Sequence, residues 1–168
     1  MDNQNKLTYS STTTNNHQIA SICPNCVQKI NDVCIKDGAK HTCFTNEICL
    51  NLDDYETFLA QNVKRDKQKT MDFTFGVNIE NRNEQKMILV ELRLNYTNWR
   101  NISKKELDDK INHSKVILGH TPIIDNQFYF VFKSDIKQQA HNHLRRLYLN
   151  RSIVFGVDLN ELKNLFFQ

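Results

Sequence analysis

The sequence contains little glycine and little proline, with four and two of these residues in 168. Low-complexity sequence is therefore confined to the N-terminus. Long apolar runs are also missing, since no stretch approaches the roughly eighteen apolar residues that a transmembrane helix needs. The first residues, MDNQNKLTYSSTTTNNHQ, lack the apolar segment of a secretory signal. These absences predict a cytoplasmic protein with no membrane contact.

The composition is ordinary for a soluble protein, with 39% hydrophobic and 24% charged residues. A chain of this length predicts one compact domain with a hydrophobic core. The formal net charge is only +3, and the excess of basic residues lies in the last third of the chain. This charge permits contact with an acidic partner such as nucleic acid without requiring one.

All five cysteines lie in one short segment. An odd number of cysteines without a secretory signal disfavours a disulfide framework. The spacing C-x2-C in CPNC suits a tetrahedral zinc site, to which two further thiolates, or a histidine in place of one, would contribute. Unligated, partly buried cysteines are an alternative, and a redox or catalytic thiol is a third. The predicted structural zinc ligands are Cys23, Cys26, Cys34 and Cys43, with His41 as the substitute.

Patterns along the chain predict three regions. Residues 1–20 are polar and are expected to be a mobile tail, 21–50 form the cysteine-rich segment, and 51–168 form an α/β domain. In this domain, helical spacing predicts helices near 53–67, 103–118, 135–150 and 158–167. Alternating or apolar runs predict strands near 71–80, 86–94, 127–133 and 152–157. This order is typical of a mixed β-sheet flanked by helices.

The two strands near 71–80 and 86–94 are expected to pair as an antiparallel hairpin. The second, KMILVELRL, is apolar on both faces, which is typical of a central strand. Charges on a central strand are costly unless they pair, bind a metal or reach a cleft. In this hairpin Asp72 would lie near Glu91 and Arg93. Two carboxylates placed together suit Mg²⁺, which takes hard oxygen ligands.

This arrangement resembles the PD-(D/E)XK nuclease-like superfamily, also called the restriction-endonuclease-like fold, across roughly residues 52–133. The resemblance implies an α-β-β-β-α-β core, with its first strand either hidden near 42–50 or missing, and Mg²⁺-dependent hydrolysis of DNA. Asp72 matches the family's first acid and Glu91 the second, while Arg93 stands where the family has lysine. Arginine cannot act as a base. In this family the lysine can migrate to the following helix, where Lys110 and Lys115 are candidates.

The same resemblance implies that Glu56, on the first helix, supplies an additional acid. Outside the motif, Arg145 and Arg146 on the basic C-terminal helix are candidates for phosphate contacts, and Trp99 for stacking on a base. These residues have alternatives as well: a solvated helix face for the two arginines, and packing of a loop for the tryptophan.

Two other interpretations compete with a nuclease. Glu91 and Arg93 are also consistent with an ion pair in an inert sheet, in which Arg93 bonds Asp72. The protein would then be a non-catalytic nuclease-like module with a zinc-stabilised N-terminal segment that binds a protein or nucleic acid. The last interpretation is a zinc-dependent binding protein with an unrelated α/β fold.

Overall fold

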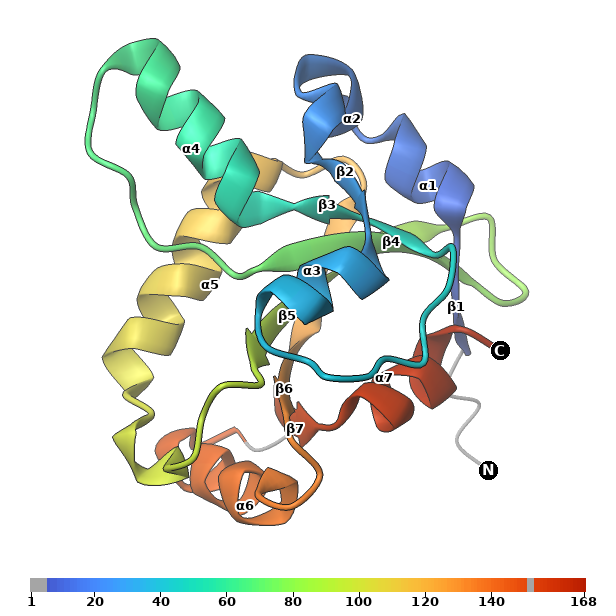
Figure 1. Ribbon diagram of the computed structural model, residues 1–168. Coiled ribbons are helices and arrows are strands. Elements are labelled where there is room, and N and C mark those ends of the chain that lie inside the picture. The colour runs from blue at the N-terminus through green and yellow to red at the C-terminus, as the bar shows by residue number, and fades with distance from the viewer. Residues whose placement is uncertain (1–5, 151–152) are drawn as a thin grey trace.

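The structure is a computed structural model that describes residues 6–150 and 153–168. Within them, seven strands form one mixed, open β-sheet flanked by helices (Figure 1). The order β2-β3-β4-β5-β6-β7 forms the main path, and β1 pairs with β4. The strands are β1 Leu7–Tyr9, β2 Val27–Lys29, β3 Ile48–Asn51, β4 Phe73–Ile79, β5 Gln85–Arg93, β6 Ile123–Phe132 and β7 Val154–Val157.

The helices cover both faces of this sheet. They are α1 Ser11–Asn16, α2 Gln18–Ile22, α3 Ile30–Lys36, α4 Leu52–Val63, α5 Lys104–Leu118, α6 Lys137–Leu147 and α7 Leu159–Phe166, with short 3-10 turns η1 Pro24–Cys26 and η2 Trp99–Asn101. Buried side chains of α2, α4, α5 and α6 pack in one core cluster, and those of α3 and α7 pack in the other. None of the described helices combines the length and apolar character needed to cross a membrane.

The predicted hairpin is confirmed. β4 and β5 are antiparallel, from the pair Phe73 and Val90 to the pair Asn78 and Gln85. β5 is central, because its other edge pairs in parallel with β6. α5 connects these two parallel strands, as parallel pairing requires a crossover. The strand expected near residues 42–50 is β3, which pairs antiparallel with β4.

The expectation of a mobile tail over residues 1–20 is wrong for its described part. Residues 7–9 form β1, and α1 and α2 follow it. Thr13, Thr14 and Ile19 are almost completely buried. The Thr14 hydroxyl accepts a hydrogen bond from the backbone N–H of Gly76, at 2.9 Å. Polar side chains here satisfy the backbone of the sheet rather than water, so composition alone misrepresented them. Residues 1–5 lie outside the described part.

Helix ends follow local sequence signals. The Asn51 side chain caps α4 by accepting from the N–H of Asp54 at 2.9 Å. Asp158 and Glu161 form a capping box at the start of α7. The Ser103 hydroxyl caps α5, but the Glu106 carboxylate binds Arg93. The bond between Glu106 and Arg93 links the first turn of α5 to the end of β5.

Candidate functional site

The two charged residues of β5 lie at its C-terminal end. Met87 and Leu89 belong to one core cluster, and Glu91 and Arg93 continue the same face of the strand. Both charged residues are buried, with exposed fractions of 1% for Glu91 and 7% for Arg93. A carboxylate and a guanidinium are therefore shielded from water on β5, and this costs free energy unless each group has a partner.

One oxygen of Glu91 binds two cations. Its Oε1 lies 3.0 Å from the guanidinium of Arg93 and accepts a 2.6 Å hydrogen bond from the amine of Lys110 on α5. Its Oε2 is buried and has no hydrogen-bond partner among the described residues. Burial, reinforced by the nearby charge of Asp72, raises the pKa of Glu91 to about 8, against the lowering effect of both cations.

Arg93 is held from three sides. Besides Glu91, its guanidinium binds the carboxylate of Glu106 at 3.2 Å and the hydroxyl of Tyr96, and it lies over the Tyr96 ring. The predicted alternative in which Arg93 bonds Asp72 is therefore wrong, because the guanidinium binds Glu91, Glu106 and Tyr96 instead. Its Nε is buried without a hydrogen-bond partner among the described residues.

Asp72 stands beside Glu91. The hairpin ladder ends at the pair Phe73 and Val90, and the N–H of Asp72 donates to the carbonyl of Val90 at 3.1 Å. Just beyond, Oδ2 of Asp72 accepts the N–H of Leu92 at 2.5 Å. Burial is the main cause that raises the pKa of Asp72 to about 6. The prediction that Asp72 lies near the end of β5 is confirmed by this bond.

A third carboxylate, Asp37, was not predicted. It ends α3, and its Oδ2 accepts the N–H of Leu94 at 3.1 Å, two residues beyond the N–H bound by Asp72. Burial raises its pKa as well, and its charge contributes to the raised pKa of Asp72. In the sequence, IKDGAK reads only as the end of a helix. The contact joins residues far apart in the chain, so no local pattern could have indicated it.

Asp37 and Asp72 face a small cavity of about 190 Å³ whose other lining residues include Asn51 and Asp53. The residue after Asp37, Gly38, lines a larger cavity of about 540 Å³. The floor of the larger cavity includes Leu94 and Phe132, at the carboxyl ends of β5 and β6. Ligands of open α/β sheets bind in the crevice outside these strand ends. The acids thus lie beside the region of the sheet where a ligand has room.

The other predicted catalytic residues divide between the site and its surroundings. Lys110 belongs to the site, whereas the amine of Lys115 lies over the ring of Phe128, 5.0 Å from its centroid. The carboxylate of Glu56 is fully buried and binds Arg65, the backbone N–H of Gln68 and His113. Glu56 is therefore committed to holding the chain that follows α4.

The structure does not assemble the predicted zinc ligands. Cys23 and Cys26 form a disulfide, so neither sulfur is a thiolate. Cys34 lies in the core cluster on the other face of the sheet, and burial raises its pKa to about 12. Cys43 is half-buried and its thiol donates to the carbonyl of Leu159, at 3.4 Å.

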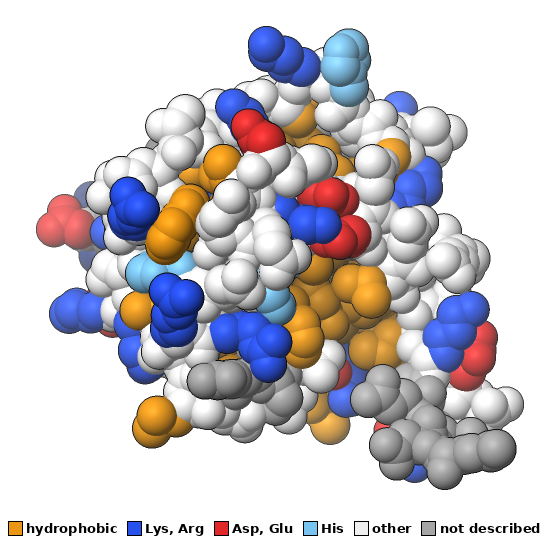
Figure 2. Space-filling model, turned by 90° about the horizontal axis from the view of Figure 1, so that it is seen from below, with side chains coloured by type: hydrophobic (Ala, Val, Ile, Leu, Met, Phe, Trp, Pro, Cys, Tyr) orange, Lys and Arg blue, Asp and Glu red, His pale blue; other side chains and the backbone are white. Residues whose placement is uncertain are grey.

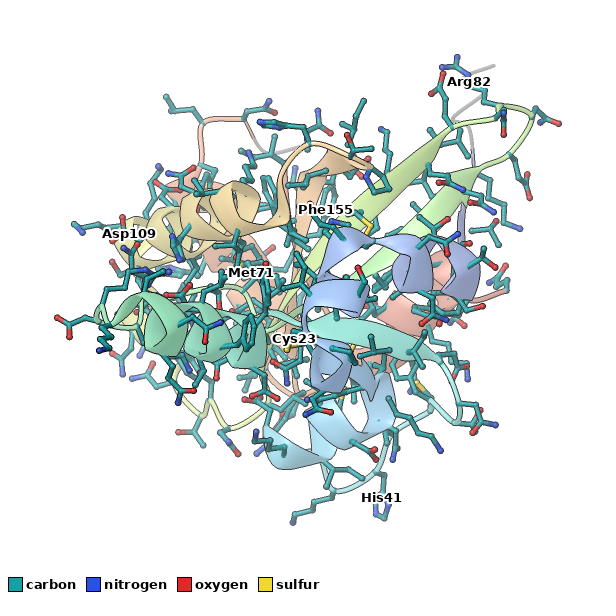
Figure 3. All side chains as sticks on the ribbon, turned by 90° about the horizontal axis from the view of Figure 1, so that it is seen from above. Cys23, His41, Met71, Arg82, Asp109 and Phe155 are labelled. Carbon is teal, nitrogen blue, oxygen red and sulfur yellow. A yellow bond between two sulfur atoms is a disulfide. The ribbon has the colours of Figure 1, made fainter. Side chains whose placement is uncertain are left out.

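His41, the proposed substitute ligand, is exposed and points away from the molecule (Figure 3). No group of three or more histidine, cysteine or acidic side chains in residues 6–150 and 153–168 is arranged to hold a metal. The spacing in CPNC correctly predicted that the two sulfurs lie close together. A tight turn of this kind, however, allows a disulfide as readily as metal binding. Because β2 and β3 belong to the main sheet, residues 21–50 are an integral part of the fold.

The predicted nucleic-acid contacts lie at α6 and η2. Arg145 and Arg146 are both exposed on α6. Lys and Arg side chains gather on the side of the molecule where α5 and α6 lie (Figure 2). Trp99 is half-buried, with its ring 5.3 Å from that of His143 and the guanidinium of Arg100 over it. Trp99 therefore packs η2 against α6.

No protein-family model, no curated protein and no solved structure matches this chain.

Proposed function

We propose that the protein is a Mg²⁺-dependent phosphodiesterase of the PD-(D/E)XK nuclease-like type, acting on DNA. The observation that carries the proposal is that Asp72 and Glu91 both lie directly beyond the last pair of the hairpin ladder, Phe73 and Val90, with one buried Glu91 oxygen unbonded among the described residues. The strand order β3-β4-β5-β6, antiparallel twice and then parallel, also supports it. Along the chain these elements follow the order β3, α4, β4, β5, α5 and β6, so α4 lies between two strands that are consecutive in the core implied by the resemblance.

The side chains fit the ion. Mg²⁺ binds one or two carboxylates and completes its coordination with water and phosphate oxygens, so a protein set of three side chains is not needed. Asp72 and Oε2 of Glu91 would hold it. When bound, it would lower the pKa of a coordinated water and stabilise charge on a phosphate.

The cations around Glu91 have separate roles in this proposal. Arg93 stays protonated at any ordinary pH, so it cannot take a proton from water. Fixed by Glu106 and Tyr96, it would instead attract the charge of the scissile phosphate. Lys110, bonded to Glu91, replaces the missing family lysine and would orient the attacking water.

The test is cleavage of plasmid and single-stranded DNA by the purified protein with Mg²⁺ or Mn²⁺. We expect cleavage by the natural protein, and its loss in Glu91→Gln and in Asp72→Asn. Lys115→Met is the matched control on α5 and is expected to retain activity. Absence of cleavage by the natural protein with any divalent metal would refute the proposal.

A second candidate is a non-catalytic module of the same fold that binds nucleic acid. The observation in its favour is that two cations share one oxygen of Glu91, which neutralises the carboxylate without any ion. Its expected signature is DNA binding without cleavage, unchanged by divalent metal or by chelator.

A further inference from the structure

A basic segment lies beside the candidate site. Residues 64–69, KRDKQK, join α4 to β4 and contain four cations and one acid. Lys64, with φ of 52°, ends α4 in a left-handed conformation, and the chain then turns back toward the helix. Lys64, Lys67 and Lys69 are exposed, while Arg65 is half-buried.

A buried carboxylate fixes this segment. Glu56 accepts hydrogen bonds from both terminal nitrogens of Arg65, at 2.5 and 3.0 Å, and from the N–H of Gln68 at 2.8 Å. Nε2 of His113, on α5, lies 2.9 Å from Oε2 of Glu56. Charge-assisted bonds of this kind are strong. They hold a segment without helix or strand in one place, and that lowers the entropy lost when its lysines bind a ligand.

The segment and α5 enclose an open groove. Its volume is about 510 Å³, and its lining includes Lys67, Lys69, Asn112 and His113. The lining also includes one acid, Asp109, which forms an exposed ion pair with Lys105 at 2.8 Å. In Figure 3, α4 and α5 lie side by side, and Asp109 marks the outer side of α5.

The groove and the candidate site share helix α5. Lys110 and His113 lie three residues apart on α5 and therefore on one face of that helix. Lys110 reaches Glu91, and His113 lines the groove. Glu106 binds Arg93, and the charge of Lys69 on the facing segment helps Arg93 to lower the pKa of Glu106 against the effect of burial. Lysines therefore line the groove, at Lys67 and Lys69, and also contact the buried Glu91, through Lys110.

The structural alternative is an ordinary solvated surface. Among the described residues, the ion pair made by an exposed lysine of this segment joins Lys67 to Asp53 at 2.8 Å, with both side chains about half exposed. Exposed pairs contribute little and are screened by salt, so Asp53 does not prevent Lys67 from binding another anion. Simple solvation also gives no reason for a buried Glu56 with four bonds to fix the segment.

We propose that Lys67 and Lys69, with the facing side of α5, bind the sugar-phosphate backbone of a nucleic-acid strand and lead it to the Asp72 and Glu91 site. Phosphate contacts by lysines position a strand without reading its sequence. This surface differs from Arg145 and Arg146 on α6. The inference rests on the proposed function for its role in catalysis, but the binding itself needs no hydrolysis.

The test is fluorescence anisotropy with labelled single-stranded and duplex DNA in EDTA, over a range of about 50 to 200 mM salt. In Lys67→Glu/Lys69→Glu we expect affinity to fall about tenfold or more, and the slope of log affinity against log salt to flatten by about 1 to 2. The matched control, Lys6→Glu/Lys29→Glu, changes the net charge equally at exposed positions remote in sequence. It should retain affinity within about threefold. Circular dichroism and thermal unfolding confirm that each variant is folded.

Several outcomes would overturn the inference. Equal losses in both variants would show a bulk charge effect. Loss of binding only in Arg145→Glu/Arg146→Glu would place the contact on α6. Binding to phosphatidylserine vesicles but not to DNA would identify an anionic membrane as the partner. If the natural protein binds DNA through Lys67 and Lys69 but does not cut it, the proposed function fails and this inference stands.

Discussion

The substitution Glu56→Gln tests how the chain after α4 is held. Glu56 is fully buried and binds Arg65, Gln68 and His113. Removing one partner of a buried ion pair commonly costs about 3 to 5 kcal/mol. The Arg65 side chain is 32% exposed, so water can solvate part of its freed charge, and glutamine retains one acceptor. We therefore expect a loss of about 2 to 3 kcal/mol at neutral pH in urea unfolding.

The pH dependence of this loss follows from the pKa of Glu56. Although desolvation opposes it, the bonds from Arg65, Gln68 and His113 lower that pKa from 4.5 to about 2. A depressed carboxylate pKa stabilises the folded state above the unfolded value and loses this effect as pH falls toward the folded value. The difference between natural protein and Glu56→Gln should thus be complete above about pH 4.5 and shrink toward about pH 2.

Limited trypsin digestion measures the local consequence. Release of the segment should speed cleavage after Lys64, Lys67 and Lys69 in Glu56→Gln, because proteases cut locally opened chains. The control is Glu80→Gln, in which the replaced carboxylate is half exposed and 3.9 Å from Lys6; a change within about 0.5 kcal/mol is expected. Unchanged stability and an unchanged digestion pattern in Glu56→Gln would refute the argument.

Two further predictions concern the end of β5. At about pH 9, above the pKa of Glu91, Lys110→Met leaves the ionised carboxylate with one cation, so urea unfolding should show a loss of about 2 kcal/mol, whereas Lys115→Met should stay within about 0.5 kcal/mol. Equal effects would contradict the assignment of Lys110. Burial raises the pKa of Glu91 from 4.5 to about 8, so its protonated form favours folding below about pH 4.5 and this contribution disappears as pH rises toward 8. Glu91→Gln should therefore gain stability relative to the natural protein across that range, and a flat difference would show that the carboxylate is ionised throughout.

Much of the sheet was predictable because its signals are local. The period-2 pattern of residues 73–79 and the two-sided apolarity of 86–94 predicted the hairpin and its central strand, and the polar turn between them fixed the register. That register alone places Asp72 beside Glu91. Helix α5 followed from Ser103 and the stripe of buried residues after it.

The missing parts depend on contacts between distant residues. Nothing near Asp37 indicates that its carboxylate meets the backbone of Leu94. The threonines of α1 look solvated by composition, yet Thr14 binds the backbone of Gly76 in β4. The odd number of cysteines disfavoured a disulfide, and this expectation is wrong for Cys23 and Cys26, because the tight turn that suits a zinc site also suits a disulfide.

The hydrogen bonding of Glu91 bears on whether this site is only structural. A buried ion pair retained for stability is expected to satisfy its polar atoms, because each orphaned group adds a desolvation cost. Here Oε2 of Glu91 and Nε of Arg93 are both buried without partners among the described residues, while Lys110 and Arg93 share the other oxygen. An apolar pair of similar volume would stabilise the sheet as well or better. Oε2 of Glu91 is the atom that the proposed function assigns to the metal, with Asp72 as the second carboxylate beside it.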